Sequence, residues 1–358
     1  MAGRLIRGRE VGTVISIILV VLAFVPLLLH IVRGKAAEVT GLSLQAPIPD
    51  TIPPGTTLVV GDPLTQRVIE RNGWLKELPF TVQFTQITGG PGVTEAFQAK
   101  ALDVGSAANI PPIHGIWVGI PVKIVAWRFR TEPWRYPLYA IGVTGKSGIS
   151  KPSDLRGKRI AYSPGQAQGF VVLSTLAKAG IPQDQVTLVD LPAEATTYIG
   201  ALAAGQVDAA PIGAGLQAKR YLDDYARNGA RVIGHGAFRD DPGVLYVRTE
   251  TLRDPAKAAA IKQYVRLWAR AQVWIDQHPN EWAQLYYVKD QGLSSEDAAT
   301  VIRESGRSDI PRDWTAAIAV EQQTINFMAR EMKRKPFDAA DIFDRRFENV
   351  AGDAAGRT

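Results

Sequence analysis

The sequence predicts an α/β protein with two lobes around a central cleft and C-terminal helices, preceded by an N-terminal transmembrane helix. Three observations support this prediction. Strand and helix patterns alternate from Thr56 onward, a second α/β series stands between two connecting strands, and residues Val11 to Val32 include no Asp, Glu, Lys or Arg. Strands that alternate with helices of this length indicate βαβ units and a mainly parallel sheet.

The size and charge of the chain limit its class. Its 358 residues, 46% hydrophobic and 21% charged, are enough for two domains. The net charge of +6 comes mostly from the N-terminus, where five basic residues and one acidic residue lie, namely Arg4, Arg7, Arg9, Arg33, Lys35 and Glu10. Because the remaining charges nearly balance, we expect no nucleic-acid partner, and the N-terminal excess favours a membrane.

The uncharged run from Val11 to Val32 spans 22 residues, which is enough to cross a bilayer as a helix. A cleaved secretory signal has an apolar core of only about 7 to 15 residues. Here Arg33 and Lys35 follow the run, and GKAAE is a poor cleavage pattern. We therefore favour an uncleaved membrane anchor, with a cleaved signal as the alternative. Either reading places the rest of the chain outside the cytoplasm, as a cell membrane-anchored, periplasmic or secreted protein.

The chain contains no cysteine, which excludes disulfides, thiolate metal sites, a cysteine nucleophile and a cysteine-linked lipid anchor. We predict this division: 1–35, membrane anchor or signal; 36–55, Pro-rich linker; 56–142 plus 243–349, lobe 1 with the C-terminal helices; 143–242, lobe 2; 350–358, polar tail.

The elements of lobe 1 follow from their periodicity. We expect strands at 56–61, 80–87 and 122–127, with helices in LTQRVIERNGWL and VTEAFQAKAL between them. After residue 250 the chain is mostly helical. The residues Ile261, Tyr264, Val265, Trp268, Ala271 and Ile275 recur at helical spacing and predict a packing face.

The connecting strands 137–144 and 243–250 enclose the elements of lobe 2. These are strands at 158–163, 185–191 and 206–212, a helix from about Gln168 to Ala179, and a helix that ends at Gly205. Gly180 and Gly205 stand where a left-handed helix cap is expected. The segments AFQAKALDVGSA (96–107) and ALAAGQVDAAPI (201–212) align without gaps, which indicates a similar strand entry in each lobe.

The best candidate ligand contacts lie where strands end, because ligands of open α/β sheets bind beyond the carboxyl ends of the strands. Ser106, Ala107, Ala108 and Asn109 lie at such an end in lobe 1, and Ile212 to Gly215 in lobe 2. Polar groups at strand ends need partners, which favours ligand contact for Ser106 and Asn109. For the two alanines, tight packing of a helix on the sheet is an equal alternative. Pro111 or Pro112 can open the next helix, with Asn109 as a potential cap.

The segment SPGQAQGF (163–170) joins a strand to a helix, so free N–H groups at the helix start are a ready anion site. Arg128, just after the strand VKIVAW, could add a charged hydrogen bond. A structural or solvated arginine is an equal alternative.

Other chemistry has little support. The chain has no G-x-G-x-x-G or G-x-x-x-x-G-K-[ST] motif, and its four histidines are not at metal-ligand spacing, so we expect no cofactor and no metal. A Ser-His-Asp site that uses His114 or His235 stays open, but no nucleophile-elbow motif accompanies either.

The segments ALDVGSAANIPPI, ISKPSDLRGKRIAYSPGQAQGFVVLSTLAKAGI and ALAAGQVDAA resemble the substrate-binding proteins of ABC importers of the nitrate, sulfonate and taurine class, which have the type II periplasmic-binding-protein fold. The resemblance covers about Thr56 to Asn349. It implies two lobes joined by two strands, a cleft that closes on one small ligand, and delivery of that ligand to a membrane permease and its ATPase.

The family's ligand loops fall on Gly61 and Asp62, on Ser106 to Asn109, and on Gly165, Gln166 and Gln168. At the last loop many sulfonate binders place an aromatic residue and a nearby acid, where this chain has Ala210, Pro211, Ile212 and Gly213. The predicted ligand is therefore a small organic anion, such as a sulfonate or taurine, with its identity open. Alternatives are an enzyme of the same fold that acts on a small organic acid, and a membrane-tethered ligand sensor. Among family enzymes, a desulfinase and a thiamin-pyrimidine synthase depend on cysteine, which is absent here.

Overall fold

The computed structural model describes residues 41–87, 89–236 and 238–356. The predicted N-terminal helix lies outside these residues. No helix within the described ranges is long and apolar enough to cross a membrane. Residues Leu44–Thr358 form one compact unit, built on two β-sheets.

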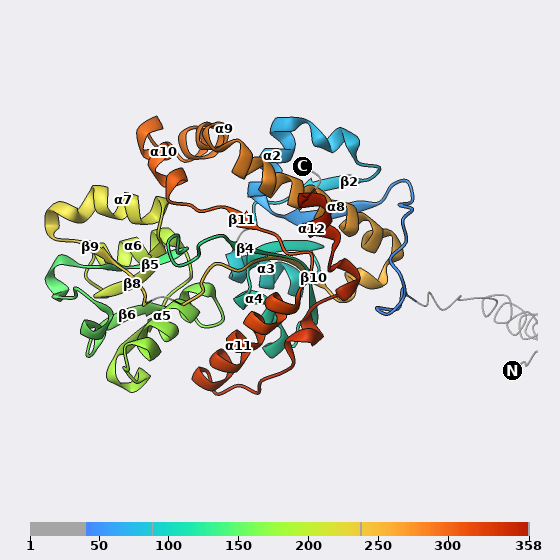
Figure 1. The fold of residues 1–358 in the computed structure, drawn as a ribbon. Helices are drawn as coiled ribbons and strands as arrows, with labels where there is room; N and C mark the ends of the chain where they lie inside the picture. The colour runs from blue at the N-terminus through green and yellow to red at the C-terminus, as the bar shows by residue number, and fades with distance from the viewer. Residues whose placement is uncertain (1–40, 88, 237, 357–358) are drawn as a thin grey trace, which may run out of the picture. The chain divides into compact units, whose positions relative to one another are not determined.

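The first sheet has six strands in the order β11-β4-β10-β3-β1-β2 (Figure 1). The strands are β1 (Thr57–Gly61), β2 (Thr81–Phe84), β3 (Val104–Ala108), β4 (Val122–Arg130), β10 (Gly243–Arg248) and β11 (Ser308–Asp309). The helices α2 (Pro63–Asn72), α3 (Gly89–Gln98) and α4 (Ile110–Trp117) follow the first three strands. We call this half lobe 1.

The second sheet has five strands in the order β7-β6-β8-β5-β9. They are β5 (Tyr139–Val143), β6 (Arg159–Tyr162), β7 (Thr187–Asp190), β8 (Ala209–Gly213) and β9 (Arg231–Ile233). Helices α5 (Ala167–Lys178), α6 (Ala195–Ala203) and α7 (Leu216–Tyr225) belong to this half, lobe 2. The predicted left-handed caps are confirmed, since Gly180 and Gly205 have φ of 65° and 66°. The exact lobe boundaries at residues 143 and 242 stay a prediction.

The expectation of mainly parallel sheets was wrong. In lobe 1, β1 pairs in parallel with β2 and β3, but β10 runs antiparallel to β3 and β4. In lobe 2, β6 pairs in parallel with β7 and β8, but β5 runs antiparallel to β8 and β9. The reason is the path of the chain: β5 enters lobe 2 from lobe 1 and β10 returns, so neither strand closes a βαβ unit.

The internal repeat corresponds to equivalent strand entries. Asp103 accepts a hydrogen bond from the backbone N–H of Val59 (3.0 Å), and Asp208 accepts one from the backbone N–H of Arg159 (2.9 Å). Each aspartate also pairs with a cation, Lys257 for Asp103 and Arg159 itself for Asp208. In both lobes, one carboxylate therefore fixes the start of a strand against the neighbouring parallel strand.

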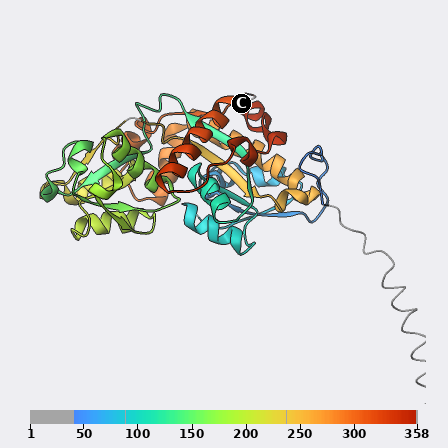
Figure 2. The same ribbon diagram turned by 90° about the horizontal axis from the view of Figure 1, so that it is seen from below.

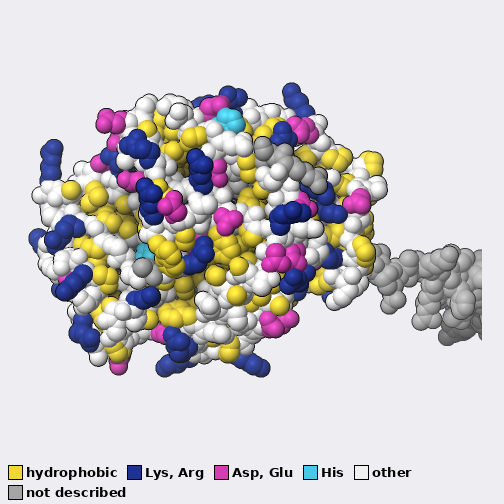
Figure 3. All heavy atoms as spheres, in the orientation of Figure 1, with side chains coloured by type: hydrophobic (Ala, Val, Ile, Leu, Met, Phe, Trp, Pro, Cys, Tyr) yellow, Lys and Arg dark blue, Asp and Glu magenta, His cyan; other side chains and the backbone are white. Residues whose placement is uncertain are grey.

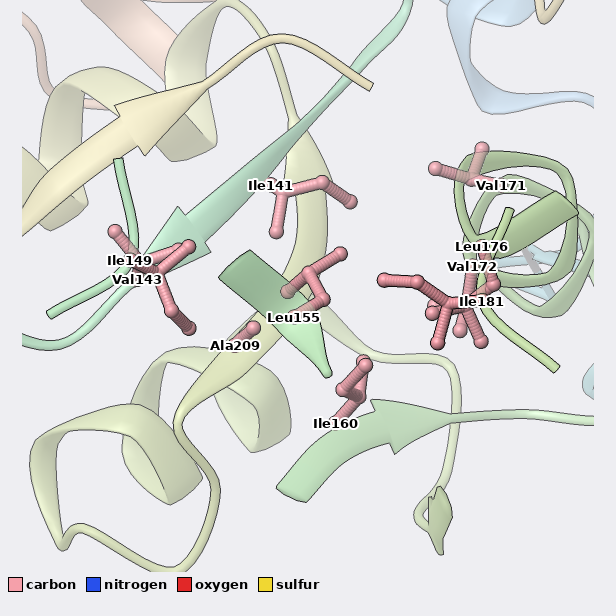
Figure 4. Close-up of a cluster of buried hydrophobic side chains, with 10 residues drawn as sticks. All are labelled: Ile141, Val143, Ile149, Leu155, Ile160, Val171, Val172, Leu176, Ile181 and Ala209. Atoms are coloured by element: carbon pink, nitrogen blue, oxygen red, sulfur yellow. The ribbon is translucent and has the colours of Figure 1, made fainter. Parts of the chain in front are cut away.

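Lobe 2 has its own hydrophobic core between the sheet and α5 (Figure 4). The buried side chains come from strands, loops and α5, and include Ile141, Val143, Ile149, Leu155, Ile160, Val171, Val172, Leu176 and Ile181. Burying one such side chain contributes about 1.5–3 kcal/mol. The core explains why a segment of this length forms a lobe of its own.

Two crossovers join the lobes, residues 131–138 between β4 and β5 and residues 234–242 between β9 and β10. Asp240 accepts hydrogen bonds from the backbone N–H groups of Leu138 (3.0 Å) and Tyr139 (2.7 Å). Asp241, which is fully buried, accepts one from the backbone N–H of Arg130 (2.7 Å). Two adjacent carboxylates of the returning crossover therefore hold the two ends of the outgoing one, at the last residue of β4 and at the start of β5.

The C-terminal region is mostly helical, as expected, with α8 (Pro255–Gln277), α9 (Pro279–Trp282), a π-helix η7 (Ala283–Asp290), α10 (Ser295–Arg303) and α11 (Thr315–Glu331). The prediction of a polar tail at 350–358 was wrong for its first residues, because α12 (Val350–Ala355) begins there and Val350 and Ala351 are buried. The predicted packing face of α8 is confirmed for all but Ile275, which is half-buried. Helix α11 touches both lobes (Figure 2): Glu321 contacts Asn109 of lobe 1, and Glu331 contacts Gln183 of lobe 2.

Candidate functional site

The carboxyl end of β3 lies beside the start of β10, at the same end of these two inner strands of the first sheet. Ala108 pairs with Gly243, and Gly243 pairs with Arg128 of β4. The predicted residues Ser106, Ala107 and Ala108 are half-buried at this end. This register brings the strand of small residues and the predicted arginine to one place.

The small residues also serve packing. A Cβ added to Gly105 would stand 2.4 Å from Val93 of α3. A side chain at this position would therefore push α3 away from the sheet. For Gly105, packing of the helix accounts for the small residue, whereas the half-buried Ser106 makes no side-chain hydrogen bond to another described residue.

Arg128 lies across Gly243, where a Cβ would stand 3.0 Å from the arginine Nε. Burial lowers the pKa of Arg128, and the carboxylates of Asp276, Asp62 and Asp241 oppose that shift. No hydrogen bond or ion pair joins its guanidinium to another group of the described residues. Arg128 is thus a half-buried cation whose hydrogen-bond donors have no partner in the described part of the chain.

Arg128 also lines a cavity of about 450 Å³, which we call the arginine pocket. Three more arginines line it, Arg130, Arg303 and Arg307, against the carboxylates of Asp276 and Glu132. Aromatic side chains complete the wall, namely Tyr136, Trp282, Tyr286 and Tyr287. The volume suits a small ligand, and four cations against two carboxylates favour an anion.

The donors in this pocket are unequally engaged. Arg130 donates a hydrogen bond to the carbonyl of Tyr136 (3.0 Å), and burial with the nearby charge of Arg128 lowers its pKa to about 10. Asp276 accepts a hydrogen bond from the backbone N–H of Ser308 (2.8 Å), and burial raises its pKa. Arg130 therefore has a structural partner, while Arg128 is the donor best placed for a ligand.

Gly61 and Asp62 lie at the end of β1. Asp62 is buried, and its carboxylate accepts hydrogen bonds from the backbone N–H of Thr65 (3.4 Å) and the hydroxyl of Tyr264 (3.2 Å). Burial raises the pKa of Asp62, against these hydrogen bonds and the charge of Arg128. Asp62 thus caps α2 and faces Arg128. A Cβ on Gly61 would stand 2.9 Å from the carbonyl oxygen of Ile87, so this position requires glycine.

Asn109 is buried and does not cap α4, contrary to expectation, because its side chain makes no capping bond. Its Nδ2 instead donates to Oε2 of Glu321 on α11, at 2.5 Å. Burial raises the pKa of Glu321 to about 8. Asn109, which was predicted to bind the ligand, is thus held by Glu321 of α11. The sequence did not indicate this contact, because the two residues are 212 positions apart.

The predicted loop of lobe 2 contacts lobe 1 directly. Gly165 has φ of 72°, and a Cβ there would stand 2.3 Å from the imidazole of His114 on α4. The side-chain oxygen of Gln166 occupies the space beside Gly90 of α3. Gln168 follows, half-buried, in the first turn of α5. These contacts bring Gly165, Gln166 and the helices that follow β2 and β3 together.

His114 therefore has a packing role in this contact. Burial lowers the pKa of His114, and the nearby charge of Arg334 lowers it further. A neutral imidazole against Gly165 closes the space between α4 and α5. No triad geometry accompanies it in the described ranges.

The remaining predicted residues are occupied by the protein itself. The side chain of Ile212 is fully buried in a second core cluster of lobe 2 with Tyr198 and Tyr221. The backbone N–H of Gly213 donates to Oε1 of Gln217 (2.6 Å). A ligand role for these two positions stays a prediction and is limited to the backbone for Ile212.

Some site residues were missed by sequence reasoning. Arg130 could have been found, because it alternates with Arg128 along a strand and so lies on the same face. Arg303, Arg307 and Glu321 gave no local signal, since the fold brings them from far along the chain. Within residues 41–87, 89–236 and 238–356, no group of three or more His, Asp or Glu side chains could hold a metal.

Comparison with known proteins adds family relations to this geometry. A family model described as NMT1/THI5 like matches residues 68–281. A Bacillus subtilis (strain 168) protein named for binding aliphatic sulfonates is 26% identical over 291 residues, which are 78% of this chain and 82% of that protein.

Two solved structures have the same fold. The alkanesulfonate-binding protein SsuA from Xanthomonas axonopodis pv. citri, bound to MOPS, matches with a TM-score of 0.67 at 20% identity, over 84% of this chain and 98% of that one. The desulfurization enzyme DSZB matches with a TM-score of 0.55 at 16% identity, over 83% and 99%. The two-lobed periplasmic-binding-protein fold is therefore confirmed, and it occurs in both binding proteins and an enzyme.

Proposed function

Because the chain belongs to the NMT1/THI5-like family, we propose that it is the extracytoplasmic solute-binding component of an ABC importer and captures a small organic anion between its lobes. The names of its relatives support this role and favour a sulfonate. The ligand would pass to a membrane permease driven by its ATPase.

One observation carries the proposal for the anion. Arg128 is half-buried, has no hydrogen-bond partner among the described residues, and lines a pocket of about 450 Å³ with three other arginines, in a wall formed by lobe 1, the outgoing crossover and the C-terminal region. A partly buried charge without a partner is costly. An anionic ligand offsets that cost, and each charged hydrogen bond contributes about 1.5–3 kcal/mol.

The proposed mechanism is closure of the lobes around the ligand. Ligand contacts to both lobes stabilise the closed state relative to the open one. Gly165 and Gln166 of lobe 2 contact α4 and α3 of lobe 1, so the described state is closed at this contact, and opening for ligand entry would require motion at the crossovers that breaks it.

An enzyme of the same fold is the alternative, supported by the likeness to DSZB. A cysteine-dependent reaction is excluded because the chain has no cysteine. We favour the binding protein because the candidate site offers cations and aromatic rings, and lacks a nucleophile paired with a base.

A thermal-shift screen of the full chain tests the proposal. Alkanesulfonates, taurine, nitrate and small carboxylates are added separately, and we expect at least one anion to raise Tm, because binding increases the free energy of unfolding by RT ln(1 + [L]/Kd). Stabilisation by none of them, together with turnover of any, would favour the enzyme.

We further propose that the run Val11–Val32 anchors the protein to the cell membrane. The argument is its length without charges and the basic residues at both ends. N-terminal sequencing of the mature protein from its native host tests it. A mature N-terminus near Ala37 would mean a cleaved signal instead.

A further inference from the structure

A second cavity, of about 620 Å³, lies between α5 of lobe 2 and α11. Trp134 of the outgoing crossover and Phe238 of the returning one line its wall. The same outgoing crossover lines the arginine pocket through Thr131, Glu132 and Tyr136, but the two cavities share no lining residue. Figure 1 shows α9 and α10 on one side of the crossovers and α11 on the other.

Aromatic rings form the wall of this second cavity. The ring centre of Phe170 lies 5.4 Å from that of Phe238, with an angle of 83° between the ring planes. It lies 5.8 Å from the ring centre of Phe327, with an angle of 88° between the planes. Trp134 is 59% exposed, the largest exposed fraction among the large hydrophobic side chains of the described residues. Rings arranged edge to face leave both edges and faces for another ring. Figure 3 shows hydrophobic side chains on the surface between α5 and α11, with basic side chains near them.

The charges that line the cavity are all positive. Lys178, Arg239 and Arg330 line it, and no Asp or Glu does. Arg239 pairs with the buried Asp241, and Arg330 pairs with Glu331 while its guanidinium lies 5.2 Å from the ring centre of Phe327. The Lys178 ammonium is exposed and has no hydrogen bond or ion pair with any described residue. One free ammonium and one exposed guanidinium therefore stand beside three phenyl rings.

We propose that this cavity is a second binding site, separate from the arginine pocket, for an aromatic organic anion such as an arylsulfonate. The ring of the ligand packs against Phe170, Phe238 and Phe327, and its acid group contacts Lys178 and Arg330. The cavity volume falls in the range of small-molecule sites. The combination of rings with cations and without carboxylates selects an anion over a neutral or cationic aromatic.

Calorimetric titration of naphthalene-2-sulfonate into the full chain tests the proposal. The test variant is Lys178→Glu with Arg330→Glu. The control is Lys146→Glu with Arg227→Glu, which makes the same change in net charge at exposed side chains outside the cavity. We expect the test variant to lose at least about tenfold in affinity, as for one charged hydrogen bond, and the control to bind like the unmodified chain. Equal weakening in both would mean general electrostatic attraction and would overturn the proposal.

The variant Arg128→Ala separates this site from the arginine pocket. If naphthalene-2-sulfonate binds in the second cavity, Arg128→Ala keeps that binding while Lys178→Glu with Arg330→Glu loses it. The reverse pattern, or no binding to the unmodified chain, would overturn the second site. Thermal unfolding of both variants checks that they stay folded, since Arg330→Glu also removes the ion pair with Glu331.

Discussion

The side chain of Arg128 crosses the Cα of Gly243, and a Cβ at position 243 would stand only 3.0 Å from Nε of the arginine. Because Gly243 of β10 has no side chain, the side chain of Arg128 on the neighbouring strand β4 can lie across it. Gly243 pairs with Arg128 on one side and with Ala108 on the other, so the glycine sets where the guanidinium lies relative to the strand ends.

The first prediction concerns Arg128 itself. Arg128→Ala should weaken binding of the stabilising anion at least about tenfold, since one charged hydrogen bond contributes about 1.5–3 kcal/mol. Calorimetric titration measures the change. Arg231→Ala, at an exposed position of β9, is the matched control and should have no effect. Unchanged affinity in Arg128→Ala would remove this residue from the site.

The second prediction concerns the path of that side chain. Gly243→Ala should force Arg128 off its preferred rotamer, at a cost of about 0.5–1.5 kcal/mol. We expect a loss of affinity for the same anion that is smaller than in Arg128→Ala. Gly234→Ala is the control, because a Cβ there meets no atom within 4 Å. If both glycine variants bind equally well, Gly243 does not position the arginine.

The third prediction concerns the contact between Gly165 and His114. Gly165→Ala should lower Tm by more than Gly180→Ala does. Both glycines have φ near 70°, which costs a side chain about 1–2 kcal/mol, but only a Cβ on Gly165 collides with a neighbour. The difference between the two variants in thermal unfolding therefore measures the clash alone. Equal values of Tm would mean that His114 moves aside freely.

The fourth prediction concerns Glu321, whose pKa burial raises to about 8 from 4.5. Between these values the folded state holds a proton that the unfolded state has released, so stability falls as the pH rises through this window. Glu321→Gln removes this dependence. We expect its Tm relative to the unmodified chain to be higher at pH 8 than at pH 5. A difference in Tm that does not change with pH would contradict the buried, protonated acid.

Much of the fold could be predicted because it depends on local patterns. The periodicity of KRIAYS and VKIVAW gave strands near their observed bounds, and Gly180 and Gly205 marked helix ends through their need for positive φ. The internal repeat indicated equivalent strand entries, which the bonds of Asp103 and Asp208 explain. The direction of β5 and β10 could not be read locally, since it depends on which lobe each strand leaves.

The candidate site was predictable only in part. Arg128 and the loop at Gly165 were named because each was expected to follow a strand. The strand β4 instead continues through Arg128 to Arg130, whereas the loop at Gly165 follows β6 and contacts α4 of lobe 1. Asn109 was expected to cap a helix, but its side-chain amide instead donates a hydrogen bond to Glu321 on α11. Ile212 shows the limit of the strand-end rule, because the rule locates a backbone position and does not say whether the side chain faces the core.

The bonds from Asp240 and Asp241 to the outgoing crossover reduce the freedom of the lobes. Backbone N–H groups of Arg130, Leu138 and Tyr139 donate to adjacent carboxylates of the other crossover, so bending or sliding of either crossover alone would break these bonds. Independent twisting of two separate linkers is thereby removed. The closure proposed above would therefore move both crossovers together rather than either one alone.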